Sequence, residues 1–111
     1  MKASLLSLLV LAAAIQAGHW KVAASYAANV ERIIELPRGA YPLLAYARFY
    51  NGRVTGTRRL IEATYLRGRR RPGIYLNEPA PDIEDGGCSV VHIWYDVKSA
   101  RVSAIECNGL A

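Results

Sequence analysis

Two cysteines near the end of the chain constrain its fold more than any other feature of the sequence. Cys88 opens an eight-residue run rich in Val, Ile, Trp and Tyr, and Cys107 closes a second run of the same length. The intervening residues 96–99 are mostly polar, so the two runs predict the strands of a β-hairpin. The C-terminal part of the fold is therefore expected to be an antiparallel sheet.

The register of this hairpin also brings the two sulfur atoms together. If residues 96–99 form the loop, Tyr95 lies opposite Ala100, and counting outward along both strands places Cys88 opposite Cys107. Directly opposed residues have Cα atoms about 4.5–5.5 Å apart, a separation that a disulfide accepts. We therefore predict a disulfide between the two cysteines; the alternative is a pair of reduced, buried thiols.

The beginning of the chain has the layout of a cleavable secretory signal. A short positive start precedes an almost unbroken apolar run over residues 3–15, and small and polar residues follow. The run is shorter than the ~20 residues that a membrane-spanning helix needs. We expect residues 1–17 to be removed during secretion or export to the periplasm, which leaves one small domain over 18–111 with no transmembrane span. The alternative is the buried first helix of a cytosolic protein.

The first part of the expected domain is predicted to be a helix. Residues 21–36 place apolar side chains at spacings of three and four, with charged and polar side chains at most of the other positions. Pro37 and Gly39 directly follow this pattern and indicate where the helix ends.

A further hairpin is predicted directly after the helix. Residues 40–50 alternate in an aromatic-rich pattern, the dipeptide Asn51-Gly52 is a strong turn signal, and residues 53–66 would return as the partner strand. In this register the apolar side chains of the second strand change face part-way along. A one-residue bulge at Gly56 would keep them on one face.

Together these patterns predict an α+β fold. One N-terminal amphipathic helix would pack on an antiparallel sheet of about four strands, formed by the two hairpins. Residues 74–76 are too short a run to assign. The cystatin-like layout is one example of this architecture, and the likeness is one of arrangement alone.

Charge is segregated along the chain, whose net charge is +5. Residues 38–71 contain nine arginines and one glutamate, whereas residues 72–87 contain four acidic residues and no basic one. Arginine clusters bind phosphate and carboxylate groups, because the planar guanidinium presents paired donors. Six arginines form the expected anion-binding or partner-binding site: Arg58, Arg59, Arg67, Arg69, Arg70 and Arg71.

Two other interpretations of these arginines stay open. Residues 67–71 could form a solvated loop that keeps the protein soluble, or they could pair with the acidic residues of 78–85. Tyr46, Tyr50 and Trp94 would add stacking to an anion site if they were exposed beside the arginines.

No catalytic, cofactor-binding or metal-binding residues are predicted. A histidine can serve as a general base, but the expected register gives His92 Ser103 as its neighbour across the hairpin and no carboxylate to orient it. The acidic residues between positions 77 and 87 match no calcium-loop spacing.

The closing stretch resembles the C-terminal end of small exported bacterial proteins with no assigned function. The resemblance covers residues 85–109 and implies no site residues. It is carried by Asp85-Gly86-Gly87-Cys88-Ser89-Val90-Val91, Tyr95-Asp96, Arg101-Val102 and Cys107-Asn108-Gly109.

The sequence therefore favours a small exported binding module: an inhibitor, or a protein that binds an anionic polymer or an acidic protein surface. The alternatives are a structural or assembly subunit of the cell envelope and a small hydrolase-type enzyme. The enzyme is disfavoured, because a disulfide would remove both thiols as nucleophiles and no grouping of Ser, His and acid is specified.

Overall fold

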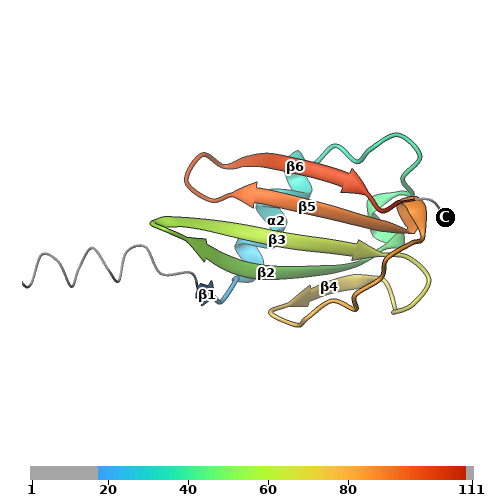
Figure 1. Cartoon of the computed structure of the whole chain (residues 1–111), viewed down its shortest axis with the longest axis horizontal. Helices are drawn as coiled ribbons and strands as arrows, with labels where there is room; N and C mark the ends of the chain where they lie inside the picture. The colour runs from blue at the N-terminus through green and yellow to red at the C-terminus, as the bar shows by residue number, and fades with distance from the viewer. Residues whose placement is uncertain (1–17, 110–111) are drawn as a thin grey trace, which may run out of the picture.

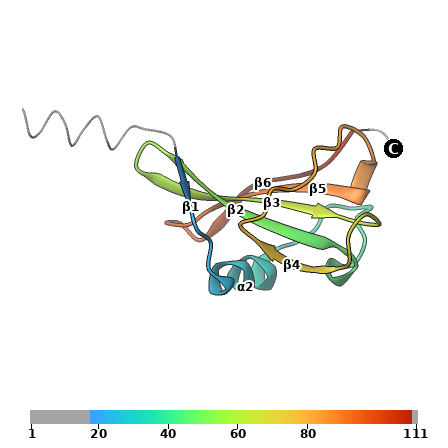
Figure 2. The ribbon, with the colours of Figure 1, turned by 90° about the horizontal axis from the view of Figure 1, so that it is seen from below.

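The computed structural model describes residues 18–109, in which one helix packs against one face of a six-stranded sheet (Figures 1 and 2). This confirms the α+β class, but the expected number of about four strands is too low. The predicted signal peptide, residues 1–17, lies outside the described residues.

The sheet has the strand order β1-β2-β3-β5-β6, and β4 pairs with β2 beside β1. β1 is antiparallel to the second half of β2, whereas β4 is parallel to the first half, so the two short strands share one edge of β2. The strands are β1 (Gly18–Trp20), β2 (Ala47–Thr55), β3 (Arg58–Leu66), β4 (Gly73–Leu76), β5 (Val90–Asp96) and β6 (Arg101–Cys107). The helix is α2 (Ala24–Ile33), and two 3-10 turns are η1 (Leu43–Ala45) and η2 (Gly87–Ser89).

The first hairpin turns later than the sequence predicts. Asn51 and Gly52 lie inside β2, opposite Glu62 and Ile61 of β3, and the chain turns at Gly56, whose φ is 62°. The predicted turn at Asn51-Gly52 and the predicted bulge at Gly56 are both wrong. Moving the turn by several residues lets β3 alternate regularly without any bulge, with Ile61, Ala63 and Tyr65 facing the main core and Leu66 facing the opposite side of the sheet.

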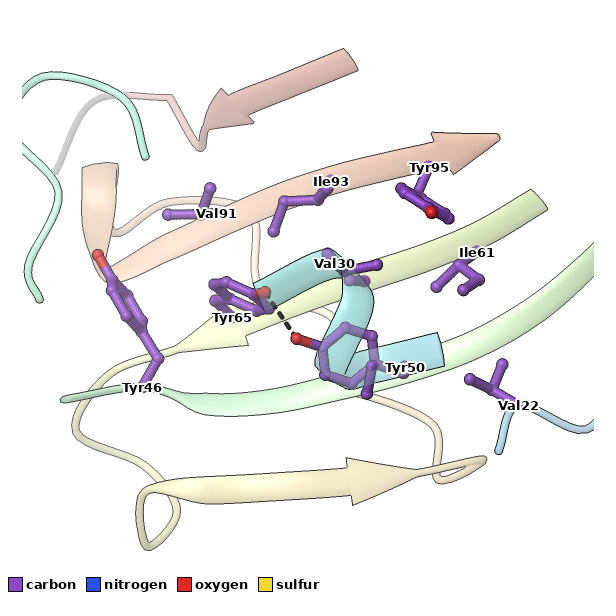
Figure 3. Close-up of a cluster of buried hydrophobic side chains, with 11 residues drawn as sticks. Val22, Val30, Tyr46, Tyr50, Ile61, Tyr65, Val91, Ile93 and Tyr95 are labelled. Carbon is purple, nitrogen blue, oxygen red and sulfur yellow. Dashed lines mark hydrogen bonds between the residues drawn. The ribbon is translucent and has the colours of Figure 1, made fainter. Parts of the chain in front are cut away.

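The main core lies between α2 and the sheet (Figure 3). Val30 of α2 is fully buried among side chains from β2, β3 and β5. The aromatic rings of Tyr50 and Tyr65 meet edge to face with their centroids 6.0 Å apart, a favourable geometry for two aromatic rings. α2 is shorter than predicted, since Ala23 and Ile34 on either side of it already have extended backbone conformations.

A second, smaller core lies on the opposite face of the sheet. Ala47, Phe49, Leu66 and Val90 are buried there under the connection from β4 to β5. This connection, coloured orange in Figure 2, crosses to the side of the sheet away from α2. It covers only one end of that face.

The last hairpin confirms the Cys88–Cys107 disulfide, whose Cα atoms are 4.6 Å apart. The predicted register is wrong, however, because Cys107 lies opposite Val91. Cys88 belongs to η2, ahead of β5, and the positive φ angles of Gly86 (106°) and Gly87 (53°) bend the chain there. The bend brings the two cysteines together without direct pairing in the ladder.

Candidate functional site: the arginine loop

The six arginines predicted to form one site lie at two ends of the same strand. Arg58 and Arg59 begin β3, and Arg67 directly follows its last residue. A nine-residue strand is about 26 Å long from its first to its last Cα. The structure therefore brings together only the four arginines of residues 67–71, named here the arginine loop.

The two arginines at the start of β3 are engaged within the fold. Arg58 forms an ion pair with Asp96, whose side chain is buried. The guanidinium of Arg59 lies 4.8 Å from the centroid of the Trp20 ring and 5.9 Å from that of Tyr26. These contacts hold the ends of β1, β3 and β5 together, which is a structural role.

Two members of the arginine loop are fixed on aromatic rings. The guanidinium carbon of Arg67 lies 3.9 Å from the centroid of the Tyr41 ring. That of Arg70 lies 4.5 Å from the centroid of Tyr75, while its Nη1 donates to Glu78 Oε2 at 2.7 Å. The hydrogen bond to Glu78 raises the pKa of the Arg70 guanidinium further. Cation–π contacts of this kind limit the rotamer freedom of both side chains.

The remaining two arginines of the loop carry charge without a partner in the described part of the chain. Arg69 and Arg71 are exposed, and neither guanidinium forms an ion pair or a hydrogen bond to another residue between positions 18 and 109. Arg69 borders a hollow of about 270 Å³ that Arg67 and Ser89 also line. Of the acidic residues in 78–85, Glu78 alone pairs with the loop within those described residues.

The aromatic partners of the loop are not the ones that the sequence indicated. Tyr46 and Tyr50, proposed as stacking residues, are fully buried in the main core. Trp94 lies in β5, two strands away from the edge that carries β4. Tyr75 could have been found only by knowing that β4 returns beside β2, a pairing for which four residues supply too short a signal. Tyr41 lies in the segment between α2 and η1, for which the sequence predicts no contact with the loop.

A buried polar network between α2 and the sheet was also missed. Glu31 Oε2 accepts hydrogen bonds from Arg48 Nε at 2.8 Å and from the Tyr50 hydroxyl at 2.6 Å, and the hydroxyls of Tyr50 and Tyr65 are 2.7 Å apart (Figure 3). Burial raises the pKa of both tyrosines, so the phenols stay protonated. The network attaches the helix to the sheet, because every buried polar group in it has a partner.

His92 has different neighbours from those predicted. It lies opposite Thr64 and Glu106 in the sheet, not opposite Ser103, and its Nε2 lies 2.7 Å from Asn108 Oδ1. The Asn108 amide also donates to backbone carbonyls of the connection between β4 and β5. His92 therefore helps to anchor that connection.

Within residues 18–109 no group of three or more His, Cys, Asp and Glu side chains could hold a metal ion. No helix of this described part is long and apolar enough to cross a membrane. Comparisons of the chain with protein-family models, with curated proteins and with solved structures found no match.

Proposed function

We propose that this protein is an exported binding module that holds anionic polymers through the arginine loop. The observation that carries the proposal is that the four arginines of the loop have two different environments. Arg67 and Arg70 are fixed on tyrosine rings, and this leaves the guanidinium groups of Arg69 and Arg71 exposed and without ion-pair partners between residues 18 and 109.

A loop built in this way suits a repeating anionic ligand. A guanidinium stacked on an aromatic ring still presents N–H donors at its edge, so Arg67 can contact a phosphate or sulfate group without leaving Tyr41. Fixing the side chains before binding lowers the entropy cost of association. Each contact with a polyanion also releases condensed counterions, which adds an affinity that falls as salt rises.

The disulfide supports export. Disulfide bonds persist in oxidising compartments outside the cytosol, and the Cys88–Cys107 bond closes the end of the sheet from which the arginine loop projects. The signal-like layout of residues 1–17 points to the same compartment.

The test is the salt dependence of binding to a labelled DNA duplex, used as a model polyanion and followed by fluorescence anisotropy. For two to four phosphate contacts, the slope of log affinity against log salt should be roughly −2 to −4. Replacing both Arg69 and Arg71 with alanine should make the slope about 1.8 units shallower, because two contacts are lost.

The matched control removes the same charge elsewhere. Lys98 and Arg101 are exposed at the turn of the last hairpin, so the double variant Lys98→Ala/Arg101→Ala also loses two positive charges. It should keep the slope of the unmodified protein. Equal changes in the two double variants would show that net charge alone drives binding, and the proposal would then fail.

A further inference from the structure

The face of the sheet away from α2 contains a groove that starts at the end left open by the β4–β5 connection and reaches residues 79–82 of the connection itself. Three hollows of about 530, 550 and 190 Å³ meet there, and Arg53 of β2 lines all three. Leu60 and Trp94 line the first, Asn51 and Pro79 lie between the second and the third, and the third continues toward His92. We call this surface the open-face groove.

Arg53 is fixed at the centre of the groove. Its Nε donates to Glu62 Oε1 at 3.0 Å, and its Nη1 lies 2.6 Å from His19 Nδ1. Because a guanidinium can only donate, His19 Nδ1 must be the acceptor, which leaves the proton of the neutral imidazole on Nε2. The groove therefore offers acceptor oxygens on Glu62 and a donor on His19, both held in place by Arg53.

The charge of the groove is balanced, in contrast to that of the arginine loop. Lys21 and Arg53 supply its two positive charges, and Glu62 and Asp82 supply its two negative charges. A charge-balanced surface whose central arginine already has a carboxylate partner gives no net attraction to an anionic ligand. The ligand that fits best is uncharged.

The lining also combines apolar surface with hydrogen-bonding groups. Trp94 and Leu60 form an apolar wall of the first hollow, and Pro79 and Pro81 form one of the third. Donors and acceptors from Arg53 and its partners lie between these walls. Between the positions of Leu60 and Thr64, four residues apart on β3, the groove extends about 13 Å along the strand, which suits an elongated ligand.

We propose that the open-face groove binds a neutral oligosaccharide. A sugar ring presents a face of C–H groups that packs on an indole or a proline, and its hydroxyl groups both donate and accept hydrogen bonds. An uncharged sugar therefore matches the apolar walls, the paired donors and acceptors and the balanced charge. The proposal rests on residues outside the arginine loop, and so does not depend on polyanion binding.

Calorimetric titration with three uncharged tetrasaccharides, made of glucose, N-acetylglucosamine or mannose, tests this proposal. At least one should bind saturably at millimolar concentration and shift the tryptophan fluorescence. Trp94→Ala should weaken that binding by about tenfold, or about 1.4 kcal/mol, because tryptophan is enriched among the few residues whose truncation costs most of the binding energy. His19→Ala, at an exposed position of β1, should weaken it by about threefold and keeps the test usable if Trp94→Ala misfolds.

The double variant Arg69→Ala/Arg71→Ala is the control, and it should bind the sugar as the unmodified protein does. Three outcomes would overturn the proposal. The first is that none of the three sugars binds. The second is that the Trp94→Ala and His19→Ala proteins both bind the sugar as tightly as the unmodified protein does. The third is that an uncharged extended peptide binds the unmodified protein as tightly as the sugar does, which would assign the groove to a peptide partner.

Discussion

Replacing Gly52 with alanine tests how β1 lies on β2. An ideal Cβ at residue 52 would overlap the carbonyl oxygen of Trp20 and would lie 2.7 and 2.8 Å from Cδ2 and Cδ1 of its indole. Because the nearest atom belongs to the backbone, a change of side-chain rotamer cannot relieve the overlap, and β1 has to move away from β2. Gly18 of the same strand has nothing within 4 Å of its own ideal Cβ, so Gly18→Ala is the matched control.

The expected loss of stability follows from these contacts. Overpacking costs about 1–3 kcal/mol in folded proteins. Moving β1 also stretches the hydrogen bond that the single N–H of the Trp20 indole shares between the carbonyls of Arg53 and Leu60, at 3.1 Å to each, and weakening this bond forfeits part of about 1 kcal/mol. We expect Gly52→Ala to lower the free energy of unfolding by about 2–3 kcal/mol, which lowers the Tm of a domain of this size by roughly 10–20 °C.

A double-mutant cycle with Trp20→Ala distinguishes two reasons why Gly52→Ala would destabilise the protein: overlap with Trp20, or backbone strain at a turn. Without the indole, β1 can move at little cost, so Gly52→Ala should cost about 1–2 kcal/mol less in the Trp20→Ala protein than in the unmodified one. If Gly52 instead lay in a tight turn, alanine would be strained by its own backbone angles whatever residue stands at position 20. Urea unfolding followed by circular dichroism gives the four free energies. Strictly additive losses, or a Gly52→Ala protein as stable as Gly18→Ala, would refute the reasoning.

Three more predictions concern stability. Reduction of the Cys88–Cys107 disulfide should lower the free energy of unfolding by about 3 kcal/mol, measured as the shift in the urea midpoint with and without reductant. Asn108→Ala removes the hydrogen bonds of one side-chain amide, so it should cost about 1–3 kcal/mol and speed amide hydrogen exchange in residues 79–86. Burial raises the pKa of Tyr50 and Tyr65 in the folded state, whereas phenols in the unfolded chain lose their protons near pH 10. The free energy of unfolding should therefore not depend on these two groups below about pH 10, and above it should fall by about 1.4 kcal/mol per pH unit for each tyrosine. Tyr50→Phe should remove about half of this pH dependence, as measured by urea titrations.

The sequence was sufficient for features that depend on composition and regular spacing. The α+β class, the presence of one helix before the two hairpins, the last hairpin and the disulfide were all predicted. The disulfide prediction nevertheless used the wrong register. A local count placed Cys88 in β5, whereas two glycines with positive φ turn it toward Cys107 from η2. Counting residues outward from the hairpin turn could identify which cysteines pair, but not the bend at Gly86 and Gly87 that positions Cys88.

The first hairpin was mispredicted because a local signal and a distant contact compete at Gly52. The dipeptide Asn51-Gly52 favours a two-residue turn when only its neighbours in sequence are considered. In the fold, glycine is needed there because Trp20, more than thirty residues away in the chain, lies directly over it. Only knowledge of the β1–β2 pairing could have replaced the turn with a continuous strand, and β1 is three residues long.

The candidate sites show how folding redistributes the charge that the sequence segregates. Three of the four arginines in β2 and β3 have acidic partners from neighbouring elements, because side chains that project from a packed sheet lie within reach of adjacent strands or the helix. These pairs are Arg48–Glu31, Arg53–Glu62 and Arg58–Asp96. The arginine loop extends beyond the end of β3, where Glu78 alone among the described acidic residues reaches it. The excess positive charge therefore remains at one end of the fold while the open face becomes balanced, and this difference is the physical basis for assigning an anionic ligand to the loop and an uncharged one to the groove.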